Sequence, residues 1–208
     1  MQNDLKYHQT TTNIVRKLQP VIQQFRYAKD YLPTRTMRQL YYSHVYPHLI
    51  GAITIWGSAS KNKAYLQPLI RTQKKIIRIV KNVRPNTHTQ PIMKELNILN
   101  LTHLYVLRVC LEMHPFIYQK KQKDRPDHDH DYISTTEIHE YPTRHSKQQH
   151  FYIPNKRSTE TKHKMDLFTR CFTEIWNSLP LKLRGDQSYY RFKRNLKVHL
   201  LEKQDTQC

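Results

Sequence analysis

The chain has 208 residues and carries 35 Lys and Arg against 16 Asp and Glu, which gives a formal net charge of +19. This length suffices for one domain or two small ones, and the positive surplus favours nucleic acid as a partner before anionic membrane, because binding releases the counterions of the polyanion. No run approaches the roughly 18 apolar residues of a membrane span, and the N-terminus, MQNDLKYHQTTTN, lacks the apolar centre of a signal peptide, so we expect an intracellular protein, nuclear or cytoplasmic, rather than a secreted one.

The N-terminal third of the chain is predicted to be helical. Apolar residues at helical spacing predict a helix over 11–31, in which Pro20 should cause a kink or divide the helix in two. The segment LPTRTMRQLYYSHVYPH predicts a second helix, whose apolar stripe Pro47 interrupts. The apolar run LIGAITIWG, 49–57, fits either a strand or a buried helix, and its neighbours favour the helix.

The segment LQPLIRTQKKIIRIVKN, 66–82, predicts an amphipathic helix with a strongly basic side. At about 100° per residue, one face gathers Leu66, Leu69, Gln73, Ile76, Ile77 and Val80. A separate arc carries Arg71, Lys74, Lys75, Arg78 and Lys81, and no acid within the segment neutralises them. Two interpretations stay open: a surface helix kept in water by its charges, or a helix that packs by one face and binds an anion by five uncompensated charges on the other.

The rest of the chain predicts further helices, separated by a polar stretch. Residues 89–114 predict a short helix, a turn at 97–100, and a longer helix that ends at Pro115 and buries Leu104, Leu107 and Leu111, with Val106 as a further candidate. Residues 119–164 are polar and charged with little periodicity, which predicts a connector that is partly disordered when free. A helix follows with Phe168, Cys171, Phe172 and Ile175 on one face, and then a closing helix, capped by Ser188, that buries Phe192, Leu196 and Leu200.

The predicted fold class is therefore all-α, with at most two strands in any sheet. We expect a helical bundle over 1–118, a polar connector over 119–164 and a C-terminal helical segment over 165–208.

No residue constellation predicts catalysis, a metal site or a cofactor. Two-metal phosphoryl transfer needs clustered carboxylates, and the sequence has no adjacent pair of aspartates. The stretch DRPDHDHDY alternates ligand types that could hold a divalent ion, but it has no apolar frame, so a solvated charge run is the favoured interpretation; its candidates are Asp124, Asp127, His128, Asp129, His130 and Asp131. The three cysteines are scattered and predict neither zinc nor disulfides, and three glycines are too few for a phosphate-binding loop.

The aromatic residues favour packing over base stacking. Tyr41, Tyr42 and Tyr46 share one predicted helix and could offer stacking faces to bases, but tyrosine at helical spacing is more often half-buried. Trp56 and Trp176 each lie at the end of an apolar stretch, which predicts that both anchor a core.

Several stretches, taken in order, resemble one protein family. They are LPTRTMRQLYYSHVYPHLIGAITIWGSA, LQPLIRTQKKIIRIV, TQPIMKELNILNLTHLY, YPTRH, IWNSLP and SYYRFKRNLKVHLL. The ordered set is similar to the C-terminal part, thumb and post-thumb, of the reverse transcriptases (RNA-directed DNA polymerases) of jockey-like non-LTR retrotransposons, and the similarity spans nearly the whole chain.

The resemblance implies a thumb that grips a template–primer duplex behind a polymerase active site. In that family the fingers, the palm and the paired catalytic aspartates precede the region that this chain resembles, so no polymerase catalysis by this chain alone is expected. The resemblance favours the anion-binding interpretation of Arg71, Lys74, Lys75, Arg78 and Lys81, with an RNA–DNA or DNA duplex as a sequence-tolerant partner. The palm and fingers of an intact reverse transcriptase are a further expected partner. The alternative is a helical protein–protein interaction module, whose binding would depend on Leu and Ile rather than on salt.

Overall fold

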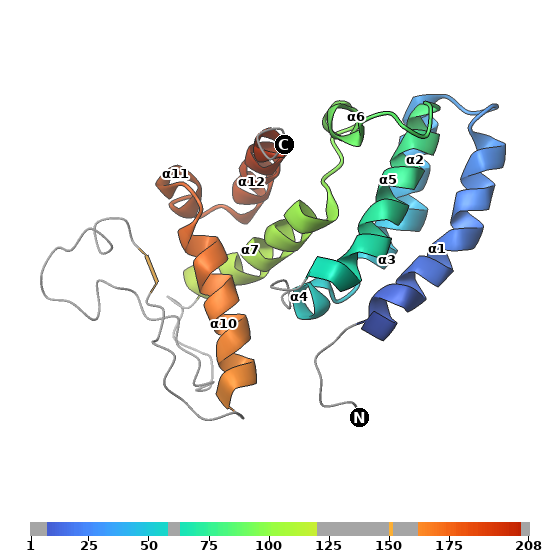
Figure 1. Cartoon of the computed structure of the whole chain (residues 1–208). Helices are drawn as coiled ribbons and strands as arrows, with labels where there is room; N and C mark the ends of the chain where they lie inside the picture. Colours follow the sequence, from blue (N-terminus) through green and yellow to red (C-terminus); the bar gives the residue numbers. More distant parts are fainter. Residues whose placement is uncertain (1–7, 58–62, 120–149, 152–161, 205–208) are drawn as a thin grey trace, which may run out of the picture. The chain divides into compact units, whose positions relative to one another are not determined.

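The computed structural model describes residues 8–57, 63–119, 150–151 and 162–204, and its elements are helices (Figure 1). The all-α prediction is confirmed for these residues. The run 49–57 is helical and not a strand, with a turn at Gly51 and Ala52 between two short helices. No described helix is long and apolar enough to cross a bilayer.

The helices follow one another closely along the first half of the chain. They are α1 (His8–Ala28), α2 (Thr34–Leu40), the π-helical turn η1 (Tyr41–Val45), α3 (Tyr46–Ile50), α4 (Ile53–Trp56), the 3-10 turn η2 (Lys63–Leu66), α5 (Gln67–Lys81), α6 (Thr89–Glu95) and α7 (Leu101–Gln119). The C-terminal helices are α10 (Lys162–Asn177), α11 (Leu181–Arg184) and α12 (Tyr189–Lys203).

The chain forms two compact units. The first comprises 1–105 together with 199–208, and the second comprises 106–198. This division differs from the sequence-based one: the last turn of α12 belongs to the first unit, and most of α7 belongs to the second. Most of the expected connector, 120–149 and 152–161, lies outside the described residues.

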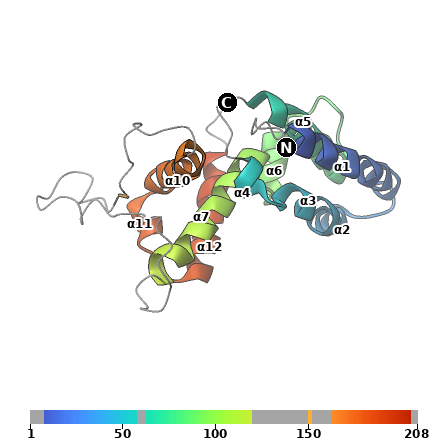
Figure 2. The ribbon, with the colours of Figure 1, turned by 90° about the horizontal axis from the view of Figure 1, so that it is seen from below.

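Three helical rods build the centre of the first unit. α1, the continuous rod α2–η1–α3, and α5 contact one another, and α1 runs beside α5 in both views (Figures 1 and 2). The predicted apolar face of α5 is confirmed, because all six of its residues are buried. α1 contributes Leu18, Ile22 and Phe25 to this core, and Trp56 is buried with its Nε1 donating to the Gly51 carbonyl at 2.7 Å.

Proline ends no helix where the sequence predicted an interruption. α1 continues across Pro20 as one helix. The Pro20 ring is exposed, and the core residues Leu18 and Ile22 on either side of it are buried. α7 continues past Pro115 to Gln119, although a proline inside a helix costs about 3 kcal/mol. The prediction that Pro115 ends this helix was wrong, because packing of the residues around the proline, including the buried His114, outweighs the missing hydrogen bond.

Pro47 is accommodated by a wider turn rather than a break. The backbone N–H of Tyr46 donates to the Tyr41 carbonyl, five residues back, which is the hydrogen bond of a π-helical turn. A proline ring at position 47 would press on the carbonyl of Ser43 in a regular α-helix, and a wider turn relieves this contact. The apolar stripe therefore runs through to Leu49, which is fully buried.

The second unit is organised around aromatic residues. Phe192 stacks on His114, with ring centroids 4.5 Å apart, and lies 5.5 Å from the Trp176 ring. The His114 Nε2 lies 2.8 Å from the Asp186 carbonyl. Two predictions from the sequence are confirmed. Trp176 is buried as a core anchor, and α12 buries Phe192, Leu196 and Leu200, of which Leu200 belongs to the first unit.

Asn177 fixes a distant backbone segment in the same unit. Its side-chain amide accepts from the Phe151 N–H and donates to the Phe151 carbonyl, each at 2.9 Å. The IWNSLP motif therefore has a structural role, since its Trp176 and Leu179 are buried beside this clasp. Phe168 lies in α10, and its side chain is outside the described set.

Candidate nucleic-acid interface

The basic face of α5, defined as Arg71, Lys74, Lys75, Arg78 and Lys81, covers about 120° of the helix surface at 100° per residue. Arg71, Lys74 and Lys75 are exposed, whereas Arg78 and Lys81 are half-buried. Since the opposite face is buried in the core of the first unit, the exposed part of this side of α5 remains for solvent or a partner. The helix therefore presents a row of cations on a rigid, well-packed element.

The five cations are not equivalent, which corrects the expectation of five uncompensated charges. Lys81 forms an ion pair with Glu95 at the end of α6. The Arg78 Nε donates to the Thr87 carbonyl at 2.8 Å. Both partners come from the segment after α5, so helical spacing within 66–82 could not identify them.

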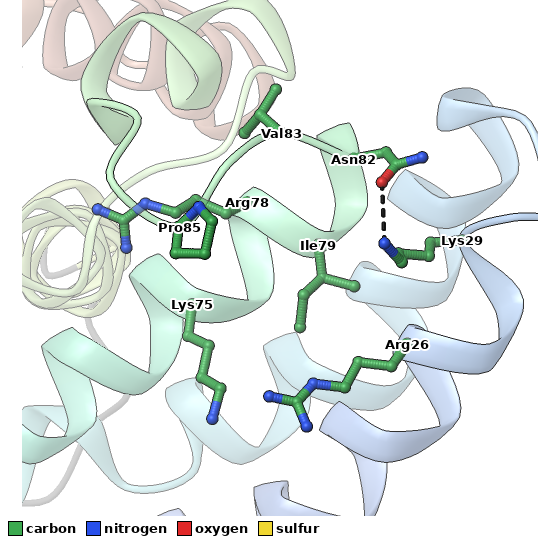
Figure 3. Close-up of a pocket in the computed structure, with 8 residues that line it drawn as sticks. All are labelled: Arg26, Lys29, Lys75, Arg78, Ile79, Asn82, Val83 and Pro85. Carbon is green, nitrogen blue, oxygen red and sulfur yellow. Dashed lines mark hydrogen bonds between the residues drawn. The ribbon is translucent and has the colours of Figure 1, made fainter.

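One edge of the basic face borders a groove between α1 and α5. The groove has a volume of about 610 Å³, and its lining consists of Arg26, Lys29, Lys75, Arg78, Ile79, Asn82, Val83 and Pro85 (Figure 3). Four of these eight residues are cationic and none is acidic. Charges from two helices thus converge on one cavity.

Lys29 and Asn82 join the two helix ends at this groove. The Lys29 Nζ donates to the Asn82 Oδ1 at 3.1 Å, drawn as the dashed line in Figure 3. Asn82 caps α5 in the left-handed conformation, at a φ of 54°, which asparagine tolerates better than most residues. The Asp30 carboxylate lies 3.8 Å from the same ammonium, so Lys29 is partly compensated.

Sequence reasoning missed Arg26 and Lys29. The available signal was the FRYAKD segment, where two cations lie three residues apart near the end of the first helix. Their position beside α5 depends on the packing of α1 along α5, which no local pattern specifies.

Acids are scarce around these cations. In the part of the first unit that the structure describes, the acids are Asp30, Glu95 and Glu202. Two of them already pair with Lys29 and Lys81. Arg71, Lys74 and Lys75 therefore give this surface a net positive potential, and a polyanion would relieve their mutual repulsion.

Tyr41, Tyr42 and Tyr46 form a cluster of rings in the α2–η1–α3 rod, and this cluster has a packing role. Tyr41 is fully buried, and burial raises the pKa of its hydroxyl well above the usual range. The Tyr42 hydroxyl donates to the Asn97 carbonyl at 2.8 Å, and Arg38 lies over the Tyr42 ring. The preference for packing over base stacking is confirmed for Tyr41. The most exposed tyrosine rings among the described residues belong to Tyr27, Tyr31 and Tyr190.

The described residues contain no group of three or more His, Cys, Asp or Glu side chains that could hold a metal ion. The acidic stretch from Asp124 to Asp131 lies outside the described part of the chain. Cys110 is buried, which raises the pKa of its thiol to about 12 and makes it a poor nucleophile at neutral pH. Cys171 is half-buried.

Comparison of the chain with protein-family models, with characterised proteins and with solved structures returned no match.

Proposed function

We propose that this chain is the thumb and post-thumb part of a jockey-like non-LTR retrotransposon reverse transcriptase, and that it binds a template–primer duplex by the phosphate backbone. The family part of the proposal is supported by the ordered motifs of the sequence. The binding part is supported above all by one observation: α5 is buried on one side and exposes Arg71, Lys74 and Lys75 on the other, in a unit with few acids.

The chemistry of the exposed side suits a phosphate backbone. Lys and Arg side chains bind phosphate oxygens without reading bases, so binding is tolerant of sequence and sensitive to salt. Because the cations stand on one helix braced by two others, they keep a fixed spacing along the duplex. The chain performs no polymerase catalysis of its own, since its sequence contains no adjacent aspartates to hold two metal ions.

The test is a salt titration of the full chain with a blunt DNA duplex and with an RNA–DNA duplex of equal length. Each phosphate contact contributes about 0.9 to the slope of log K against log salt. The double variant Arg71→Gln, Lys74→Gln should therefore bind more weakly at low salt, with a slope shallower by roughly 1.8. Folding should be unaffected, because both side chains are exposed and Gln is a good helix former.

The matched control removes the same charges elsewhere. Arg191 and Lys193 are exposed on the part of α12 in the second unit, and Arg191→Gln, Lys193→Gln also removes one Arg and one Lys. This control should keep a slope close to that of the unmodified chain. Equal losses in the two variants would mean that net charge alone attracts the duplex, and the proposed interface would be refuted.

A further inference from the structure

The α1–α5 groove combines features that a bare phosphate-binding surface does not need. Its lining includes three apolar residues, here called the apolar floor: Ile79 and Val83, which are half-buried, and Pro85, which is exposed. Its volume of about 610 Å³ lies within the range of small-molecule sites, which runs from roughly 300 to 1,000 Å³.

The charged ends at the groove fall into two groups. Lys29 is tied to Asn82, and Arg78 is tied to the Thr87 carbonyl, so these two side chains are held in place by the protein. Arg26 and Lys75 extend from facing helices, and Figure 3 shows their charged ends pointing toward one another on one side of Ile79. Both are exposed. The Arg26 Nη1 donates only to a neighbour in its own helix, the exposed Gln23 Oε1 at 3.3 Å. Two cations that converge with no acid in the lining repel each other unless an anion lies between them.

We propose that this groove holds one unpaired nucleotide, with its phosphate between Arg26 and Lys75 and its base on the apolar floor. The ligand class follows from the lining: a group with a charged phosphate at one end and a flat apolar face at the other matches the two parts of the groove. The inference rests on the proposed nucleic-acid binding and specifies it further. The duplex lies on the exposed side of α5, and an overhanging or displaced nucleotide enters the groove at the edge of that side.

The experiment compares labelled duplexes that are identical except for a single unpaired nucleotide at one end. The unmodified full chain should bind the overhang duplex at least fivefold more tightly than the blunt duplex. The double variant Arg26→Gln, Lys75→Gln should lose this preference. The double variant Arg71→Gln, Lys74→Gln removes the same charges from the same unit outside the groove, and it should keep the preference while binding both duplexes more weakly. Circular dichroism and thermal unfolding establish that both variants are folded.

Free adenosine monophosphate distinguishes a nucleotide site from a simple anion site. It should compete with the overhang duplex, whereas adenosine and inorganic phosphate at equal concentration should compete at least tenfold less well. Equal competition by inorganic phosphate would refute the role of the apolar floor. Equal binding of overhang and blunt duplexes, or an overhang preference that survives in Arg26→Gln, Lys75→Gln, would refute the site.

The two proposals fail in different ways. Duplex binding that depends on Arg71 and Lys74, without an overhang preference, would retain the proposed function and remove the groove site. Binding of adenosine monophosphate that depends on Arg26 and Lys75, without duplex binding at low salt, would retain the groove site and remove the proposed function.

Discussion

Gln73 is a buried polar residue in the apolar face of α5, and its replacement by leucine gives a sharp test of the packing. The side chain is 1% exposed, and its Nε2 donates to the Tyr41 hydroxyl at 3.0 Å and to the Leu99 carbonyl at 2.9 Å. Gln73 therefore links α5 to the α2–η1–α3 rod, through Tyr41, and to the loop before α7, through Leu99. Its own Oε1 is buried and has no hydrogen-bond partner.

The magnitude follows from counting buried polar groups in Gln73→Leu. The change leaves the Tyr41 hydroxyl and the Leu99 carbonyl without their donor, and each loss costs about 1–3 kcal/mol. It also removes the unpaired Oε1, which returns about 1–3 kcal/mol. The net expectation is a free energy of unfolding lower by about 1–3 kcal/mol. Leucine has a similar volume, so a cavity adds little.

A double-mutant cycle with Tyr41→Phe isolates the bond itself. Tyr41→Phe alone leaves one Gln73 N–H unsatisfied, whereas the double variant removes both partners. The double variant should therefore be more stable than the sum of the single losses predicts, by about 1 kcal/mol. The measurement is urea unfolding followed by far-UV circular dichroism and by tryptophan fluorescence. Additivity within about 0.5 kcal/mol would refute the coupling, and a Gln73→Leu variant more stable than the unmodified chain would show that the unpaired Oε1 dominates.

Two further predictions concern Asn100, at the start of α7, and the histidines His103 and His199. The Asn100 Oδ1 accepts from the His103 backbone N–H at 2.8 Å and so caps the N-terminus of α7. Asn100→Ala should lower the free energy of unfolding, measured in urea, by about 1 kcal/mol, and Asn100→Ser should restore most of this loss. An alanine variant as stable as the unmodified chain would exclude a stabilising cap. Burial lowers the pKa of His103 and His199 below the usual 6.5, and Lys203 lowers both further. Because the unfolded chain then binds more protons as the pH falls through 6.5, stability is full above this pH and is lost below it. The melting temperature of the unmodified chain should be lower at pH 5.5 than at pH 7.5, and the difference should be smaller in the His199→Gln variant. Equal differences in the two proteins would show that His199 does not contribute to the pH dependence.

The sequence predicted the fold class and the buried side of the main helix, because both follow from local periodicity. Leu69, Ile76 and Val80 recur at a spacing that places them on one face of any regular helix, whatever surrounds it. The continuation of α7 past Pro115 could not be predicted in this way, since it depends on tertiary packing with residues far along the chain, such as the stacking of Phe192 on the neighbouring His114.

The candidate interface was predictable only in part for the same reason. The exposed positions of Arg71, Lys74 and Lys75 follow from the helix period, and the structure agrees with it. The pairing of Lys81 with Glu95 depends on how α6 folds back onto α5, and the approach of Arg26 depends on how α1 lies along α5. Contacts of this kind arise from tertiary packing and leave no periodic trace in a single sequence.

The π-helical turn at Tyr41–Val45 has a consequence for how the chain can vary in length. Met37, Tyr41, Val45 and Leu49 are all buried and recur every four residues, whereas an α-helix turns about 40° too far in each such step. The wider turn takes up part of this excess and keeps all four on the core side. Deleting one residue within the turn would restore a regular helix and leave Leu49 on the core side, because the wider turn already absorbs the rotation of about one residue, but the Pro47 ring would then press on the carbonyl four residues before it. A homologue lacking the proline at 47 is therefore expected to tolerate a one-residue gap at this point, whereas this chain should not.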